Sequence, residues 1–335
     1  MKLEEIGEFG FIKKISRGCL IRDDSVVRAI GDDAAAFVTA SDELTLVTTD
    51  LLVERVHFLM QEISGFALGH KALAVNLSDI AAMGGTAREA FVSIAIPKTC
   101  PIEYLEDVYD GMKALASQFD VNILGGDTTG SKADLVINIV VVGSVAEDEI
   151  LCRNKAQPGD VVCSTGFLGD SRAGLHLILN DIEADTKGLK ALKSAHLMPK
   201  PFLREGRFLA RRPGIHAAID VSDGLSSDIG HIADESGVGV RLFSDKIPLS
   251  DALVEFCDRF DFDPVEFALS GGEDYTLLCT ISKESAASVR EDYLKAFKEP
   301  LYPIGEILQE RDMEVVGSEG QVRSFAPGGW DHFKV

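Results

Sequence analysis

The chain has 335 residues, and its 33 Lys and Arg against 54 Asp and Glu give a formal net charge of −21. This length predicts about two domains, and 46% hydrophobic with 26% charged residues are typical of a globular protein. The acidic balance argues against a nucleic acid or an anionic membrane as a partner. It does not exclude a small anionic substrate, because bound cations can reverse the local field.

The N-terminal segment, MKLEEIGEFGFIKK, carries charges throughout and shows no apolar core of a signal peptide. The longest uncharged apolar stretch, Leu135–Ala146, is shorter than the ~18 residues that a membrane-spanning helix needs. We therefore expect a cytoplasmic protein without a membrane partner. The six cysteines are scattered with no CxxC pair, which favours reduced core residues over a zinc site.

Strand-like runs rich in Val, Ile, Thr and Phe alternate with helical patterns along the chain. The expected strands are Leu44–Thr49, Phe91–Ile96, Val121–Leu124, Leu135–Val142, Asp160–Thr165, Ala217–Val221, Val238–Phe243 and Tyr275–Ile281. The expected helices are Ser64–Met83, Ile102–Phe119, Ser171–Asn180, Pro201–Ala210, Leu225–Ser236 and Lys283–Phe297. This interleaving predicts an α/β or α+β chain. The polar, turn-rich segment Arg153–Asp160 places the domain boundary between residues 152 and 153.

Five short segments carry Asp where an apolar strand or helix is expected to end. They are GDD (Gly31–Asp33), TTD (Thr48–Asp50), NLSD (Asn76–Asp79), GGDTTGS (Gly125–Ser131) and DVSDG (Asp220–Gly224). Any one of them is explained as well by a turn or a helix cap. Together they suit two or more Mg²⁺ ions, with hydroxyl support from Thr48 and Thr49.

Asp79 carries the strongest single signal, because it lies on an apolar helical stripe. A carboxylate there must be paired, neutralised or bound to a metal, since an unpaired buried charge is very costly. A buried cap to a neighbouring loop is the alternative. Asp220, at the carboxyl end of a strand, and Asp223, near the start of a helix, add a second pair at a position where α/β proteins bind ligands.

No GxxxxGK[ST] sequence is present, which excludes an ordinary P-loop ATPase. Three other segments could place backbone N–H groups near a phosphate: Gly125–Ser131 with Asp127, the strand–turn–helix Ser164–Gly174, and SGGEDY with Glu273. A plain turn is the alternative for each. His57 and the single tryptophan, Trp330, complete the candidates; each could equally be structural.

Taken together, these segments resemble the thiamine-monophosphate kinase family, within the superfamily of aminoimidazole ribonucleotide synthetase. The matching segments follow one another over nearly the whole chain: GEFGFI, IGDDAA, TTDLLVERVHF, KALAVNLSDIAAMG, NILGGDTT, STGFLGDSRAGL, IDVSDGLSSDIGHIA, ALSGGEDY and GWDHF. The resemblance implies an N-terminal sheet-and-helix domain, residues 1–152, that binds ATP and Mg²⁺ and forms a homodimer. It also implies a C-terminal α/β domain, residues 153–335, that closes the active site.

The resemblance further assigns roles to residues. The implied Mg²⁺ ligands are Asp33, Thr48, Thr49, Asp50, Asp79, Asp127, Asp220 and Asp223. The implied nucleotide contacts are Tyr109, Gly126, Asp127, Arg153 and Ser222. The implied contacts to thiamine monophosphate are His57, Glu273 and Trp330. The implied reaction transfers a phosphoryl group from ATP directly to thiamine monophosphate, without an acid/base residue.

The chemistry agrees with that assignment. A phosphate monoester has a second pKa of ~6, so the acceptor is mostly ionised at pH 7 and needs no base. The obstacle is repulsion between the acceptor phosphate and the triphosphate, which several Mg²⁺ ions can screen.

Two positions depart from the family's pattern: Arg55 stands where Gly is usual, and Gly130 where Arg is usual. They leave open a relative that binds divalent cations without turnover. Another ATP-using enzyme of the superfamily is the other alternative. Two features argue against another such enzyme. The sequence lacks the reactive N-terminal Cys segment of selenophosphate synthetase, and it ends in DHFKV, without the C-terminal Cys of the hydrogenase maturation relative.

Overall fold

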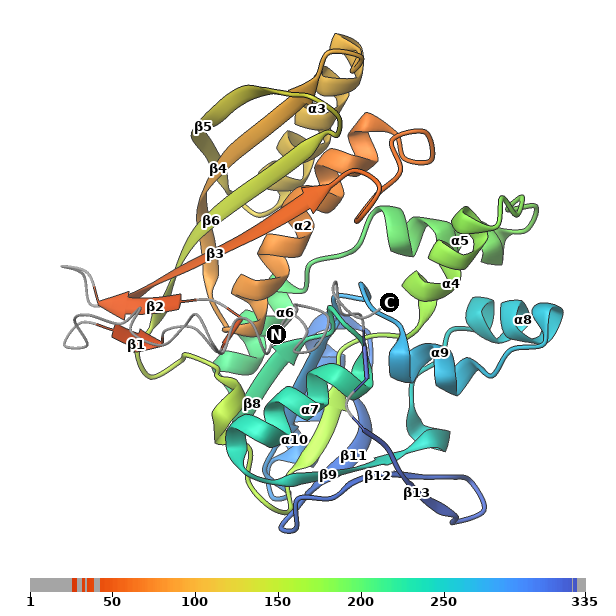
Figure 1. Cartoon of the computed structure of the whole chain (residues 1–335). Helices are drawn as coiled ribbons and strands as arrows, with labels where there is room; N and C mark the ends of the chain where they lie inside the picture. Colours follow the sequence, from red (N-terminus) through yellow and green to blue (C-terminus); the bar gives the residue numbers. More distant parts are fainter. Residues whose placement is uncertain (1–25, 29–31, 34, 39–42, 327, 330–335) are drawn as a thin grey trace, which may run out of the picture.

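The computed structural model of the chain describes residues 26–28, 32–33, 35–38, 43–326 and 328–329. A six-stranded sheet with the order β1-β2-β3-β6-β4-β5 forms the N-terminal part (Figure 1). Its neighbouring strands are antiparallel except for the parallel pair β4 and β5. The elements are β1 (Val26–Arg28), β2 (Ala35–Val38), β3 (Glu43–Val53), α2 (Gly65–Ala82), β4 (Thr86–Pro97), α3 (Ile102–Gln118), β5 (Asn122–Ser131) and β6 (Val136–Ala146).

A seven-stranded sheet with the order β13-β12-β9-β11-β7-β10-β8 forms the C-terminal part, and only β9 and β12 pair in parallel. Its strands are β7 (Val161–Ser164), β8 (Ile215–Asp220), β9 (Gly239–Phe243), β10 (Leu277–Ile281), β11 (Tyr302–Leu308), β12 (Met313–Val316) and β13 (Val322–Ser324). Its helices are α4 (Asp170–Leu179), α5 (Lys187–Leu197), α6 (Leu203–Ala210), α7 (Leu225–Ser236), α8 (Asp251–Phe260), α9 (Pro264–Ser270) and α10 (Ala286–Phe297), with short 3₁₀ turns at Arg153–Lys155 and Ser244–Lys246. The expected α/β architecture of two sheet-and-helix units is confirmed.

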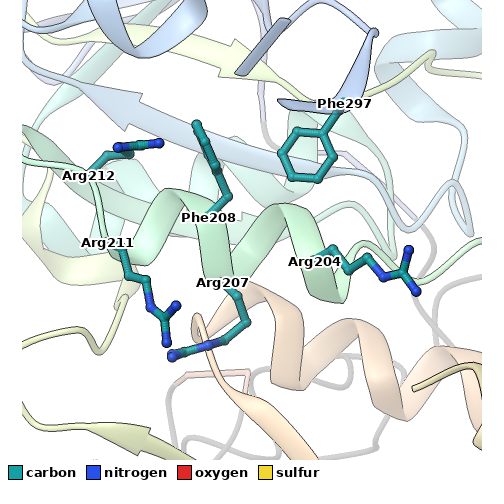
Figure 2. A pocket seen from close by; sticks show the side chains of 6 residues that line it. All are labelled: Arg204, Arg207, Phe208, Arg211, Arg212 and Phe297. Atoms are coloured by element: carbon teal, nitrogen blue, oxygen red, sulfur yellow. The ribbon is translucent and has the colours of Figure 1, made fainter. Parts of the chain in front are cut away.

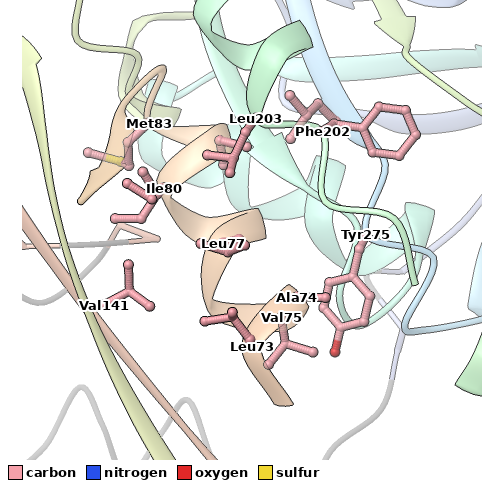
Figure 3. Close-up of a cluster of buried hydrophobic side chains, with 14 of the residues drawn as sticks. Leu73, Ala74, Val75, Leu77, Ile80, Met83, Val141, Phe202, Leu203 and Tyr275 are labelled. Carbon is pink, nitrogen blue, oxygen red and sulfur yellow. The ribbon is translucent and has the colours of Figure 1, made fainter. Parts of the chain in front are cut away.

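Helix α2 is the element around which the two sheets are built. The side chain of Ser64 caps its first turn by accepting a hydrogen bond from Ala67 N at 3.2 Å, and almost all of its residues are buried. A helix that is buried on nearly every side belongs in a core. Figure 3 shows α2 between Val141 of β6 on one side and Leu203 and Tyr275 of the C-terminal part on the other.

Close approach of the backbones allows α3 to pack on α2. A Cβ atom at Gly69 would lie 1.8 Å from the carbonyl oxygen of Val108, and one at Gly111 would lie 1.9 Å from that of Phe66. Glycine is therefore required on both helices at this crossing.

The segment Gly125–Ser131 differs from expectation. It forms no turn but belongs to β5, an edge strand that pairs with β4. Within the described residues, no helix is long and apolar enough to cross a membrane.

Candidate functional site

Three carboxylates from separate segments meet beside α2. Asp33 follows β1, Asp79 lies near the end of α2, and Asp220 is the last residue of β8. One oxygen of each lies within 4.8 Å of the others. Two of the residues belong to the N-terminal part and one to the C-terminal part, so the cluster joins the two sheets at the core.

Hydroxyl groups orient these carboxylates. Thr48 Oγ1 donates a hydrogen bond to Asp79 Oδ2, and Ser78 Oγ donates to Asp220 Oδ2 at 2.6 Å. Asn76, one turn earlier on α2, accepts a hydrogen bond from the backbone N–H of Asp50 at 3.0 Å. The sequence NLSD on α2 therefore fixes residues of both β3 and β8.

The shared environment changes the acidity of these groups. Burial, with the neighbouring charge of Asp33, raises the pKa of Asp50 to about 6. Burial is also the main cause that raises the pKa of Asp79 and of Asp220 well above the usual value for Asp. Carboxylates this close in a buried site must share a proton or a cation. An all-oxygen donor set of carboxylates and a hydroxyl fits Mg²⁺.

Arg153, expected to contact the nucleotide, is held by the acidic cluster. Its Nε lies 3.2 Å from Asp33 Oδ2 and 3.6 Å from Asp32 Oδ1, and a second nitrogen donates to Asp33. The backbone carbonyl of Arg153 accepts a hydrogen bond from Ser236 at 2.8 Å. The C-terminal part thus places a cation at the rim of the cluster.

A second group of possible ligands lies next to the first. Asp223, Asp228 and His231 each offer one atom within 4.8 Å of the others. Asp228 Oδ2 also accepts hydrogen bonds from the backbone N–H groups of Asp223 and Gly224, at 3.1 and 3.0 Å. Neither Asp228 nor His231 was expected from the sequence; their spacing of three residues on α7 was the available signal.

Glu273 lies in the segment that leads into β10. Its backbone N–H donates to the carbonyl oxygen of Ser222 at 2.7 Å, which joins two of the expected site residues. Burial alone would raise the pKa of Glu273, but Lys71, His196 and His57 together lower it. His57 and Glu273, both expected to contact the substrate, therefore share one electrostatic environment. Trp330 lies outside the described residues.

Other expected residues lie apart from the cluster in the described chain. The side chain of Thr49 accepts a hydrogen bond from Asn138 at 2.8 Å and points away from α2, because successive strand residues alternate faces. Asp127 lies on the edge strand β5, opposite Ser93 of β4. Three strand spacings of ~4.8 Å separate β5 from β3, which is a distance of roughly 14 Å. Gly126 is the neighbour of Asp127, and Tyr109 lies on α3.

The start of α4, considered above for an anion, is occupied by a side chain of the protein. Asp274 Oδ2 accepts a hydrogen bond from Gly169 N at 2.6 Å, and its Oδ1 accepts one from Ser171 N at 3.1 Å. That interpretation of Ser164–Gly174 was wrong, because the carboxylate of Asp274 already satisfies the first amides of the helix.

A separate cavity of about 370 Å³ lies along α6 (Figure 2). It is lined by Arg204, Arg207, Phe208, Arg211, Arg212 and Phe297. Arg207 and Arg211 both pair with Glu149, at 3.0 and 3.3 Å. In Figure 2, Arg204 and Arg212 lie at opposite ends of the helix, so the four guanidinium groups do not converge on one point.

Comparison with known proteins places this geometry in a family. The sequence profile "AIR synthase related protein, N-terminal domain" matches residues 31–145, and the profile of the C-terminal domain matches residues 157–318. The thiamine-monophosphate kinase of Aquifex aeolicus is 36% identical over 99% of this chain and 100% of its own length. That of Haemophilus influenzae is 36% identical over 98% of both chains.

A solved structure agrees. The protein AaThiL, complexed with AMPPCP and TMP, has a TM-score of 0.87 and 34% identity, and the match covers 99% of both chains. The structure of thiamine monophosphate kinase from Aquifex aeolicus has a TM-score of 0.81 at 34% identity, over 98% of this chain and 100% of that one. The chain described here belongs to the thiamine-monophosphate kinase family, within the AIR synthase related proteins.

Proposed function

We propose that this protein transfers the terminal phosphoryl group of ATP to thiamine monophosphate in a direct, Mg²⁺-assisted, in-line reaction. The observation that carries the proposal is the meeting of Asp33, Asp79 and Asp220 from both parts of the chain. Full-length relatives named thiamine-monophosphate kinase support the reaction, and a relative complexed with AMPPCP and TMP supports the donor and the acceptor.

The metal ligands of this proposal are the clustered carboxylates. Asp33, Asp50, Asp79 and Asp220 would hold Mg²⁺, with Thr48 in hydrogen-bond contact with Asp79. Asp127 and Thr49 are proposed as further ligands on the resemblance alone, and Asp223 on the resemblance and on its place beside Asp228 and His231. Bound Mg²⁺ would offset the negative charge of the phosphate oxygens and of the transferring group. Ser78 and Thr48 keep the carboxylates oriented.

The remaining site residues bind and orient. Arg153 supplies positive charge at the rim of the cluster, where it can also reach a nucleotide phosphate, and Ser222, Tyr109 and Gly126 are proposed as further nucleotide contacts. His57, Glu273 and Trp330 are proposed to bind thiamine monophosphate. No residue is assigned as a base, since the acceptor is a phosphate that is mostly ionised at pH 7.

We also propose a homodimer formed through the face of the first sheet that α2 and α3 leave uncovered. Leu51, Phe91 and Leu124 on that sheet are 51%, 38% and 60% exposed. Exposed apolar side chains on an uncovered sheet face favour a protein interface. Asp127 and Gly126 lie on the edge strand of the same sheet.

The division between residues 152 and 153 is proposed as the domain boundary. The use of ATP supports a cytoplasmic location.

One experiment tests the proposed reaction. Purified protein is incubated with ATP, Mg²⁺ and thiamine monophosphate, and the products are separated by chromatography. We expect ADP and thiamine diphosphate in equal amounts, and neither product with EDTA in place of Mg²⁺. ADP released without thiamine diphosphate would reject the acceptor, and no consumption of ATP would reject the reaction.

A further inference from the structure

Lys71 is a buried cation on α2. It is 1% exposed, which is unusual because lysine is almost never fully buried without a partner. Its Nζ lies 2.9 Å from Glu273 Oε1 and 3.4 Å from His196 Nε2. The ion pair joins a helix of the N-terminal part to the segment that precedes β10 in the C-terminal part.

His196, near the end of α5, holds the other side of the same carboxylate. It is 5% exposed, and its Nδ1 lies 3.2 Å from Glu273 Oε2 and 3.0 Å from Ser171 Oγ. Burial, with the charge of Lys71, lowers the pKa of His196 to about 4, so the ring is neutral near pH 7. A neutral ring that accepts from Lys71 at Nε2 carries its proton on Nδ1, which is hydrogen-bonded to Ser171 Oγ and lies beside Glu273 Oε2.

The backbone at Glu273 is held in an uncommon conformation. Glu273 has φ +63° and Tyr275 has φ +53°, in the left-handed region that residues with side chains seldom adopt. Strained backbone persists only where its surroundings fix it, and it is found most often at functional sites. The hydrogen bond from Glu273 N to Ser222 O and the contacts of Glu273 with Lys71 and His196 supply that fixation.

We propose that Lys71 and His196 are positioning residues that hold Glu273 in the orientation in which its carboxylate binds the cationic organic part of the phosphate acceptor. The inference rests on the proposed function and assigns two residues to its substrate specificity. The side chain of Glu273 remains 28% exposed, so its carboxylate has oxygen lone pairs left for a ligand after both contacts are made. Lys71 and His196 themselves are too deeply buried to touch that ligand.

A purely structural ion pair would behave differently from a positioning pair. Removing it would lower the melting temperature and leave the Michaelis constants of the folded enzyme unchanged. Removing a positioning pair would raise the KM for thiamine monophosphate and leave the KM for ATP unchanged, because only the acceptor is proposed to contact Glu273. The ratio of the two constants therefore separates the two roles.

The test compares Lys71→Met and His196→Leu with the wild type in the assay described above. For each folded variant we expect the KM for thiamine monophosphate to rise by roughly ten- to hundredfold, the range for a charge-assisted hydrogen bond, and the KM for ATP to change less than about twofold. His196→Gln, which keeps a donor and an acceptor, is expected to stay near the wild type. Should Lys71→Met not fold, His196→Leu carries the test, because it removes no charge.

Lys200→Met is the control, since Lys200, whose side chain is 63% exposed, pairs at 2.8 Å with the buried Glu205 and not with Glu273. It should leave both constants unchanged. In a Glu273→Gln background, Lys71→Met should raise the KM for thiamine monophosphate no further, because both changes act through one carboxylate. A wild-type KM for the acceptor in the folded variants would overturn this inference, whereas an inactive wild type would overturn the proposed function instead.

Discussion

Ser78 on α2 donates a hydrogen bond of 2.6 Å to Asp220 at the end of β8, two residues that are 142 positions apart in the chain. The next residue of the helix, Asp79, accepts a hydrogen bond from Thr48 of β3. Consecutive residues of one buried helix therefore orient groups from both sheets. The helix that forms the core also sets the geometry of the acidic cluster.

Ser78→Ala should lower the free energy of unfolding by about 1–3 kcal/mol, because a buried carboxylate loses its hydrogen-bond donor. Urea unfolding in EDTA measures this loss without any contribution from bound metal. Ser288→Ala is the control, since Ser288 is exposed and donates to the carbonyl oxygen of Ser285, the residue that precedes α10. Equal stability of the two variants would contradict the role of Ser78.

Much of the fold could be predicted from periodicity. The helices α2, α3, α6 and α7 were expected close to their observed bounds, because their apolar residues repeat at the spacing of one buried face. The expected strands Leu44–Thr49 and Phe91–Ile96 lie inside β3 and β4, which are both longer than expected. The helices α5, α8 and α9 were not expected. In the short helix α9, Asp263 caps the first turn by accepting from Val265 N at 2.8 Å, with Pro264 at the first helical position. A helix of seven residues is too short for its apolar residues to show a helical repeat, so the sequence pattern did not predict it.

The site was predicted unevenly for a physical reason. Asp79 was recognisable because a charge on an apolar helical face requires a partner. The links made by Ser78, Lys71 and His196 depend on tertiary contacts between segments more than 100 residues apart, which no local pattern encodes. The glycines in Gly125–Ser131 favoured a turn in the sequence analysis. In the structure this segment is a strand, because its backbone pairs with β4.

Metal-free protein should become less stable as the pH rises. Asp50 has a pKa of about 6 in the folded chain against 3.8 as its ordinary value, and burial raises the pKa of Asp79 further. The folded state thus keeps protons that the unfolded chain releases, so this stability is present below pH ~4 and is lost as the pH rises through 6. In EDTA, the melting temperature should fall between pH 5 and 8.

Asp79→Asn should reduce that fall and melt at a higher temperature than the wild type at pH 8 in EDTA, because one buried charge is removed. With Mg²⁺, the wild type should gain stability at pH 8, by ~2.7 kcal/mol at a hundred times the dissociation constant, and the variant should gain much less. An identical response to Mg²⁺ in both proteins would exclude Asp79 as a ligand.

Asp79→Asn should also lower turnover by at least ~100-fold, since a lost metal ligand weakens the stabilisation of charge in the transition state. The initial rate at saturating ATP and thiamine monophosphate measures the effect. Asp110→Asn is the control, because Asp110 is exposed on α3 and pairs with the exposed Lys113 at 3.2 Å. Wild-type turnover of folded Asp79→Asn at moderate Mg²⁺ would refute the assignment.

The uncovered face of the first sheet predicts a dimer. Sedimentation should give twice the 36.1 kDa of one chain for the wild type and a single chain for Phe91→Glu, because a charge buried in an apolar interface is costly. Leu294→Glu introduces the same charge at a 49% exposed position on α10 and should remain dimeric. A wild type that sediments as one chain at micromolar concentration would reject the interface.

Two glycines of β5 should differ in their response to the same change. A Cβ at Gly126 would lie 1.7 Å from the carbonyl oxygen of Val92, and its φ of +149° disfavours a side chain, so Gly126→Ala must disturb the pairing of β4 and β5. We expect it to lower the free energy of unfolding by roughly 2–4 kcal/mol.

No atom lies within 4 Å of a Cβ at Gly130, so Gly130→Ala should change the free energy of unfolding by less than ~0.5 kcal/mol. Gly130→Arg, which introduces the residue that the family usually has there, should be tolerated for the same reason. Urea unfolding of the three variants measures the contrast, and a large loss in Gly130→Arg would mean that this position has lost the space for the family's side chain.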